Sequence, residues 1–370
     1  MKNHNANNER IKRRYFNYLM EAKRQSESTI DAVASALASF EMHNKYRDFK
    51  AFHHRQAVAF KKRLAEQVSD TTGKPLSKAT LYSTLMHLKR FFQWLSQVPG
   101  YKSSVQYHDA EYFSMSDNDA RIATARRTKP VPSMEQIRYA ISLMPNSTEI
   151  ERRDRALVAF TILTGARDSA IASIKLKHLD MATGSVYQDA REVNTKFRKT
   201  FTTYFFPVGD EIRQILSDWV DYLKYQKHWS GEDPLFPSTH IGLSNTGQFE
   251  VAGLRQTHWS NTTPIRSIVK DCFHAAGLPY FNPHSFRNTL VQLGQEMCKT
   301  PEQFKAWSQN LGHEDVLTTM VSYGAVSENR QKDIFHTFRT TSVNDQSRPL
   351  DIGELAILMR EFLDKQGARN

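Results

Sequence analysis

The sequence predicts a mainly α-helical protein of two domains, the second of which also carries a small antiparallel β-sheet. The length of 370 residues favours two domains over one. Most segments place apolar residues three or four positions apart, which is the spacing of one helix face. Only the region 185–208 changes to a run rich in Val, Thr, Tyr and Phe, the composition of short strands. With 39% hydrophobic and 24% charged residues, the chain can form packed cores.

The charge balance points to a polyanionic partner. Lysine and arginine exceed aspartate and glutamate by 50 − 39 = 11, and the sequence pI is about 9.5. Such an excess favours nucleic acid or an anionic membrane surface, although a solvated basic face has the same composition. The N-terminus has no apolar signal core, and no stretch approaches 18 uninterrupted apolar residues. These features predict a cytoplasmic protein without a membrane partner.

The first domain, expected over 11–120, is predicted to be a helical bundle. Ser28 precedes an apolar series at helical spacing, and 51–68 is a second amphipathic candidate. Ser77 is a candidate N-cap of a third helix, whose basic residues lie off its apolar stripe. The bundle is therefore expected to have basic faces.

Two segments are predicted to lie outside the folded domains. Residues 1–10 are polar and Asn-rich and are predicted to be a disordered N-terminus. Residues 121–132 carry four basic residues and two prolines without any period, which is typical of a linker. Such a basic linker either contacts DNA phosphates or serves as a solvated tether.

The second domain, expected over 133–345, is predicted to begin with a capping box at 133–136 that opens a helix. The segment 154–164 is apolar nearly all round, which indicates a buried helix, and Gly165 ends it. The region 185–208 is predicted to form a short antiparallel sheet around a basic turn.

The remaining segments of this domain alternate between helix and loop. Helical patterns return at 210–228 and 263–276, whereas 230–262 is predicted to be loop because Gly, Ser, Asn and Pro are scattered through it. A C-terminal tail is expected over 346–370, with an amphipathic helix at about 351–366. That helix is expected to pack either on its own domain or on a neighbouring protomer.

Four short segments carry residues suited to phosphoryl chemistry. They are 164–170 (TGARDSA), 283–289 (PHSFRNT), 311–313 (LGH), and Tyr323 within TTMVSYGAV. In this order they resemble the tyrosine recombinases, also called the phage integrase family. The family pattern is an Arg after a Thr-Gly turn, a His-x-x-Arg box, a Leu-Gly-His box and a closing Tyr. The resemblance covers about 130–340, and the helical bundle more loosely resembles the family's core-binding domain.

The resemblance implies a catalytic set of Arg167, His284, Arg287, His313 and Tyr323, in an α+β tyrosine-recombinase catalytic domain. The residue types suit the chemistry. Two guanidiniums can clamp the oxygens of a pentavalent phosphate, and two histidines can move protons near neutral pH. A tyrosine oxygen can form a covalent phosphoryl intermediate, although its pKa of about 10 means that it needs assistance.

No metal or other cofactor is expected. The chain has no Gly-rich phosphate loop of the G-x-x-x-x-G-K-[ST] type and no carboxylate cluster suited to paired magnesium ions. Cys272 and Cys298 form no C-x-x-C pair, which disfavours a zinc site or a disulfide framework.

The family also has a β-hairpin lysine, which here corresponds to Lys196 or Lys199. Lys196 matches the Thr-Lys sequence of the family, whereas Lys199 matches the usual number of residues between the lysine and the proline that ends the third strand, here Pro207. We prefer Lys196, and expect it to protonate the departing 5′ oxygen.

Two positions depart from the family pattern. The nucleophile commonly lies nine residues after the Leu-Gly-His histidine, where this chain has Ser322, and Tyr323 is the tenth. One residue rotates a helix by about 100°. The family often has an acid three residues after the first arginine, where this chain has Ala170; Asp168 is the alternative support for that arginine.

The resemblance implies a site-specific DNA recombinase or integrase serving a mobile genetic element or a chromosome. Its expected partners are double-stranded DNA, held in a clamp between the two domains, and three further copies of the chain in a tetramer on DNA. DNA-bending or directionality factors are candidate accessory partners. The alternatives are a DNA-binding protein of the same fold that has lost catalysis, and an enzyme resembling a type IB topoisomerase or a telomere resolvase.

Overall fold

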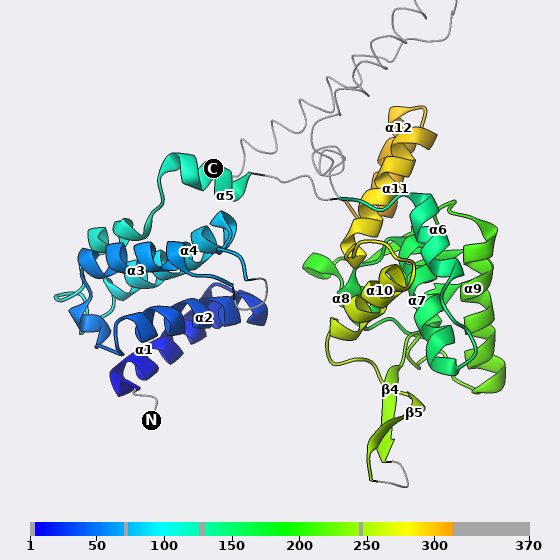
Figure 1. Cartoon of the computed structure of the whole chain (residues 1–370), viewed down its shortest axis with the longest axis horizontal. Coiled ribbons are helices and arrows are strands. Elements are labelled where there is room, and N and C mark those ends of the chain that lie inside the picture. The colour runs from blue at the N-terminus through cyan, green and yellow to red at the C-terminus, as the bar shows by residue number, and fades with distance from the viewer. Residues whose placement is uncertain (1–3, 70–72, 126–129, 244–246, 314–370) are drawn as a thin grey trace, which may run out of the picture. The chain divides into compact units, whose positions relative to one another are not determined.

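The computed structural model describes residues 4–69, 73–125, 130–243 and 247–313 (Figure 1). The chain divides into two compact units, Met1–Arg127 and Thr128–Asn370. Tyr323 and the predicted tail helix lie outside the described residues. Within the described ranges, no helix is both long enough and apolar enough to cross a membrane.

The N-terminal unit is helical. Its helices are α1 (Ala6–Asn17), α2 (Glu27–His43), α3 (His54–Glu66), α4 (Lys78–Leu95) and α5 (Asp117–Thr124), joined by a π-helical turn Tyr18–Ala22 and by 3₁₀ segments Phe49–Ala51 and Tyr107–Phe113. Buried aromatic rings form much of the core, and the Phe52 and Phe92 rings stack with centroids 3.7 Å apart. The predicted cap of α4 is confirmed, because the Thr80 N–H donates to the Ser77 hydroxyl at 3.1 Å.

Three boundaries in this unit differ from the prediction, and side-chain caps explain two of them. Helix α1 begins inside the segment 1–10 that was predicted to be disordered, since the Asn5 side chain accepts the first free N–H groups. Helix α2 is preceded by Ser26 and not by Ser28. Helix α5 covers the first four residues of the predicted linker 121–132, because Ser116 caps it and acidic residues occupy its first turn.

The C-terminal unit surrounds one buried helix, α7 (Glu149–Thr164) (Figure 1). The other helices are α6 (Met134–Ser142), α8 (Asp168–Ile171), α9 (Asp210–Asp221), α10 (Thr263–Ala275), α11 (Pro283–Met297) and α12 (Pro301–Asn310), with a π-helical turn Tyr222–Gln226 after α9. The capping box of α6 and the end of α7 at Gly165 are confirmed. Ten residues of α7 are buried, which agrees with its nearly uniform apolar composition.

The predicted antiparallel sheet is confirmed in the order β1 (Leu179–Asp180), β2 (Ser185–Gln188), β3 (Phe201–Tyr204). Residues 189–200 connect β2 to β3 and include a 3₁₀ turn, Lys196–Arg198.

The prediction of loop over 230–262 is wrong in part. Strands β4 (Ser238–Leu243) and β5 (Phe249–Arg255) form a hairpin that projects from the helical body (Figure 1). The sequence of this region resembles a loop because it contains Gly242, Gly247 and Gly253. Several of its apolar side chains are exposed on the surface. The two strands therefore lack the alternation of apolar and polar residues that marks a half-buried strand in a sequence.

Candidate active site

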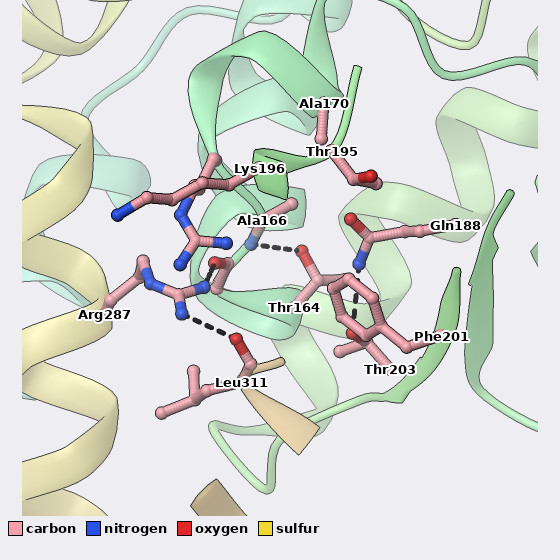
Figure 2. A pocket seen from close by; sticks show the side chains of 12 residues that line it. Thr164, Ala166, Ala170, Gln188, Thr195, Lys196, Phe201, Thr203, Arg287 and Leu311 are labelled. Carbon is pink, nitrogen blue, oxygen red and sulfur yellow. Dashed lines mark hydrogen bonds between the residues drawn. The ribbon is translucent and has the colours of Figure 1, made fainter. Parts of the chain in front are cut away.

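Arg287 on α11 joins three of the four predicted segments. Its side chain is 5% exposed. One terminal nitrogen donates to the Gly165 carbonyl at 2.5 Å, and the other donates to the Leu311 carbonyl at 2.6 Å (Figure 2). The second nitrogen also lies 2.9 Å from His313 Nε2. The guanidinium therefore holds 164–170, 283–289 and 311–313 together.

Two glycines allow these segments to approach so closely. Gly165 has φ +58°, and a Cβ there would lie 2.8 Å from a Leu311 methyl carbon and 2.9 Å from one of Leu290. Gly312 has φ +71°, and a Cβ there would lie 2.7 Å from the Phe201 ring. Both positions combine left-handed backbone with a close contact, so another residue would be strained at either.

Arg167 lies at the N-cap of α8. It is half-buried and lines the same pocket as Arg287. Among the described residues, its side chain makes no hydrogen bond or ion pair, and burial lowers its pKa. A guanidinium in this state has all its N–H groups available for an anion.

The acidic residue next to Arg167 is engaged elsewhere. Arg266 on α10 donates two hydrogen bonds to one Asp168 oxygen, at 2.9 and 2.8 Å, and the Ser169 N–H donates to the other oxygen at 3.0 Å. Ala170 lines the pocket without offering a polar group. The structure therefore shows Asp168 supporting α8 and α10, with no bond to Arg167.

Lys196 lines the pocket, and Figure 2 shows its side chain on the same side as Arg287. Lys199 is absent from the described pocket lining, although both lysines lie near the exposed Phe197 ring, at 4.8 and 5.9 Å from its centroid. Lys196 is also close enough to both predicted histidines to affect their pKa values. The geometry therefore favours Lys196 over Lys199.

The sheet that carries the lysine connection is fixed to the end of α12. Asn310 accepts the Tyr204 N–H at 2.7 Å and donates to the Tyr204 carbonyl at 2.8 Å. Thr203 donates to the Asn310 carbonyl at 3.1 Å and accepts from the Gln188 side chain at 3.0 Å. No sequence motif marks these residues, and the only signal is the position of Asn310 just before Leu311.

The cations lower the pKa values of both histidines. Burial, followed by Arg287 and Arg167, lowers the pKa of His313 to about 3. Burial, followed by Arg287 and Arg167, also lowers the pKa of His284, which lies one helical turn from Arg287. Arginine can only donate, so His313 Nε2 must be an unprotonated acceptor in its contact with Arg287.

The pocket thus gathers positive charge around a small space. Arg167, Lys196 and Arg287 contribute cations, and the two histidines are neutral at pH 7. Among the described residues, no group of three or more His, Cys, Asp or Glu side chains is placed to hold a metal ion. A site of this kind can bind a phosphate group and stabilise additional charge on its oxygens.

The sequence is similar to the phage integrase family and to two tyrosine recombinases. A profile of the phage integrase family matches residues 134–330, more than half of the chain. Tyrosine recombinase XerD of Oceanobacillus iheyensis is 22% identical over 338 residues, covering 88% of this chain and 96% of that protein. Tyrosine recombinase XerC of Lactobacillus delbrueckii subsp. bulgaricus is 24% identical over 258 residues, covering 68% of this chain and 73% of that protein.

Solved integrase structures share the fold, which confirms the predicted fold class. A lambda integrase dimer bound to a COC′ core site has a TM-score of 0.59 and 14% identity, covering 88% of this chain and 83% of that chain. A lambda integrase tetramer bound to a Holliday junction has a TM-score of 0.54 and 11% identity, covering 86% and 79%. Because the family profile spans more than half of the sequence, this chain belongs to the phage integrase family and is a site-specific recombinase of the tyrosine type.

Proposed function

We propose that this recombinase cleaves and rejoins double-stranded DNA without a metal ion, through a 3′-phosphotyrosyl intermediate at Tyr323. The observation that carries the proposal is the convergence of Arg167, Lys196 and Arg287 on one pocket, with two neutral histidines close enough for these cations to lower their pKa values. Three cations can compensate the charge of a scissile phosphate. Tyr323 takes its role from its place in the family pattern.

Cleavage exchanges one phosphoester bond for another. The Tyr323 oxygen forms a bond to phosphorus while the bond from phosphorus to the 5′ oxygen breaks, which leaves a phosphotyrosine and a free 5′ hydroxyl. Arg167 and Arg287 stabilise the charge that develops on the non-bridging oxygens. Attack by the 5′ hydroxyl of another strand reverses the step, so the energy of the linkage is retained.

Two proton transfers accompany cleavage. The departing 5′ oxygen takes a proton from Lys196, and the phenolic proton passes to a neutral imidazole. Both His284 and His313 have lowered pKa values and are unprotonated at pH 7, but His313 Nε2 already accepts a hydrogen bond from Arg287 and its pKa is about 3, so His284 is the better acceptor of the two.

We further propose that the two units clamp duplex DNA and that four copies assemble to exchange strands between two duplexes. The family resemblance supports this arrangement, as do the lambda integrase dimer on a core site and the tetramer on a Holliday junction. The net charge of +11 suits a polyanionic partner. Accessory DNA-bending or directionality factors stay a prediction.

A nicked duplex tests the nucleophile. A nick near the cut site lets the 5′ fragment diffuse away, so the protein stays covalently attached to DNA. We expect the wild-type protein and Ser322→Ala to form this adduct and Tyr323→Phe to form none, as measured by denaturing gel electrophoresis. Sequencing the trapped DNA would identify the site and the cleaved strand. Full trapping by Tyr323→Phe would refute the assignment, and binding without any adduct from the wild-type protein would favour a DNA-binding role.

A further inference from the structure

We propose that Glu192 is a positioning residue for Lys196, because it anchors the 189–200 connection to the body of the domain through a ring of four charges. We call this ring the Glu192 clamp; its members are Lys175, Lys177, Glu192 and Glu232. The inference rests on the proposed role of Lys196 as the proton donor.

In the Glu192 clamp, each lysine bridges both carboxylates. Lys175 Nζ lies 2.8 Å from an oxygen of Glu192 and 2.8 Å from one of Glu232. Lys177 Nζ lies 2.9 Å from the other Glu192 oxygen and 2.8 Å from the other Glu232 oxygen. A single exposed ion pair contributes little, but a closed network of alternating charges holds its members in one arrangement. The two lysines lower the pKa of Glu192 to about 2, so it stays ionised at working pH.

Three of the four charges belong to a fixed part of the domain. Lys175 and Lys177 flank the start of the 3₁₀ turn Leu176–His178. The Lys177 N–H donates to the Gly231 carbonyl at 2.8 Å, which joins this turn to the segment that carries Glu232. Glu192 is the only member that comes from the connection between β2 and β3. The Glu192 clamp therefore joins the connection to a rigid support.

The clamp lies four residues before Lys196, and the residues between them are also held. Val193 is buried, and the Asn194 N–H donates to the Ser173 hydroxyl at 2.8 Å. Across the neck of the connection, the Ala190 N–H donates to the Thr200 hydroxyl at 3.0 Å. Because these contacts fix the backbone between Glu192 and Lys196, the placement of Glu192 determines where Lys196 lies.

The tip of the connection needs this support because it is strained. Phe197 and Arg198, directly after Lys196, have φ values of +61° and +51°. Non-glycine residues adopt this conformation at a cost in free energy, and it persists only where the surroundings impose it. Within the tip, the Thr195 hydroxyl donates to the Lys199 carbonyl at 2.7 Å and the Arg198 N–H donates to the Thr195 carbonyl at 3.2 Å, which closes the turn. Phe197 is 77% exposed, so its ring does little to hold the closed turn against the body of the domain. The anchors at the base of the connection hold it there, and loss of the Glu192 clamp would let Lys196 leave the pocket.

The test compares Glu192→Gln with the wild-type full chain on the nicked duplex. We expect single-turnover cleavage to slow by roughly tenfold, a fraction of the 10²–10⁴ that general acid catalysis contributes. DNA affinity should change less than twofold. The matched control is Glu211→Gln, which removes an exposed carboxylate whose ion pair with Arg138 Nε, at 3.4 Å, lies outside the pocket lining. This control should cleave at the wild-type rate.

A second substrate identifies the step affected. In it, sulfur replaces the departing 5′ oxygen, and a thiolate leaves without needing a proton. We expect this substrate to restore wild-type rates to both Lys196→Ala and Glu192→Gln. The inference about Glu192 is wrong if Glu192→Gln cleaves the oxygen substrate at the wild-type rate, or if it stays slow on the sulfur substrate. In either case, restored cleavage by Lys196→Ala on the sulfur substrate means that the role of Lys196 stands. If Lys196→Ala is not restored, the proposed role of Lys196 fails.

Discussion

The two arginines of the active site are held in opposite ways. Arg287 is almost fully buried and gives its terminal nitrogens to two backbone carbonyls and to His313. Arg167 is half-buried and, within the described part of the chain, makes no side-chain hydrogen bond. Both residues come from the family pattern with the same expected role. Their surroundings show that Arg287 also holds the segments of the site together, whereas the Arg167 guanidinium faces the pocket without such bonds among the described residues.

The difference separates stability from binding within one pocket. Bonds from Arg287 to Gly165 and Leu311 stabilise the DNA-free protein. Arg167 is a partly desolvated cation that pairs with no side chain within residues 4–313 as far as the structure describes them, and burial lowers its pKa. Such a group lowers the stability of the free protein, and an arriving phosphate would relieve that cost. The site is therefore preorganised on the Arg287 side and open on the Arg167 side.

The largest expected effect comes from Arg287→Lys. A lysine keeps the charge but cannot span two carbonyls, so buried acceptors lose their donors at a cost of about 1–3 kcal/mol each. We expect covalent trapping to be lost and the Tm of the DNA-free protein to fall by roughly 5–10 °C, at about 2–4 °C per kcal/mol for a domain of this size. Calorimetry and the nicked-duplex assay measure both. An unchanged Tm would show that these bonds do not stabilise the fold.

Arg167→Ala should separate the two properties. We expect cleavage to fall by roughly 10²–10³, the loss typical of one donor to a developing oxyanion. The Tm should stay within about 1 °C of the wild-type value or rise slightly, because removal of a partly desolvated cation relieves its cost. The same two assays apply. A drop in Tm as large as that of Arg287→Lys would mean that both arginines hold the fold, and the comparison would fail.

Local signals predicted the elements whose stability is local. The capping box at Ser133 and Gln136, the apolar series of α7 and the cap at Ser77 depend on residues within one helix. The order of the Arg, His-x-x-Arg and Leu-Gly-His segments along the chain matches the family pattern. That match was enough to predict that the three segments lie together in the fold. The β4–β5 hairpin was predicted to be loop. Its apolar residues are exposed, so the sequence there shows no alternation of buried apolar and exposed polar positions.

The role of each side chain depends on contacts that the sequence does not encode locally. The same residue type at positions 167 and 287 is left open in one case and bonded in the other, because only Arg287 faces two free carbonyls. Asp168 was a candidate support for Arg167, yet Arg266, 98 residues further along the chain, binds it. Lys196 and Lys199 are likewise three residues apart in one connection, yet of the two only Lys196 is among the described residues that line the pocket.

The smallest expected effect concerns pH and the Arg287 side of the site. The pKa of His313 is lowered to about 3, below the value of about 6.5 expected in the unfolded chain. Below pH 6.5 the unfolded chain therefore binds more protons at this position, so the stability of the folded protein falls as pH falls from 6.5 toward 3. We expect the Tm of the wild-type protein to drop more between pH 7.5 and 5.5 than that of His313→Gln, which cannot titrate.

Bound duplex DNA should reduce this difference. A phosphate beside Arg167 and Arg287 offsets the cations that hold the pKa of His313 down, so the pKa rises toward its ordinary value and the pH dependence of stability becomes smaller. Thermal unfolding of both proteins with and without the duplex measures this change. Equal pH dependence in the two DNA-free proteins would mean that His313 titrates normally. Its Nε2 would then carry a proton at pH 5.5. The contact with Arg287 requires an unprotonated acceptor, so it would not hold 283–289 and 311–313 together at that pH.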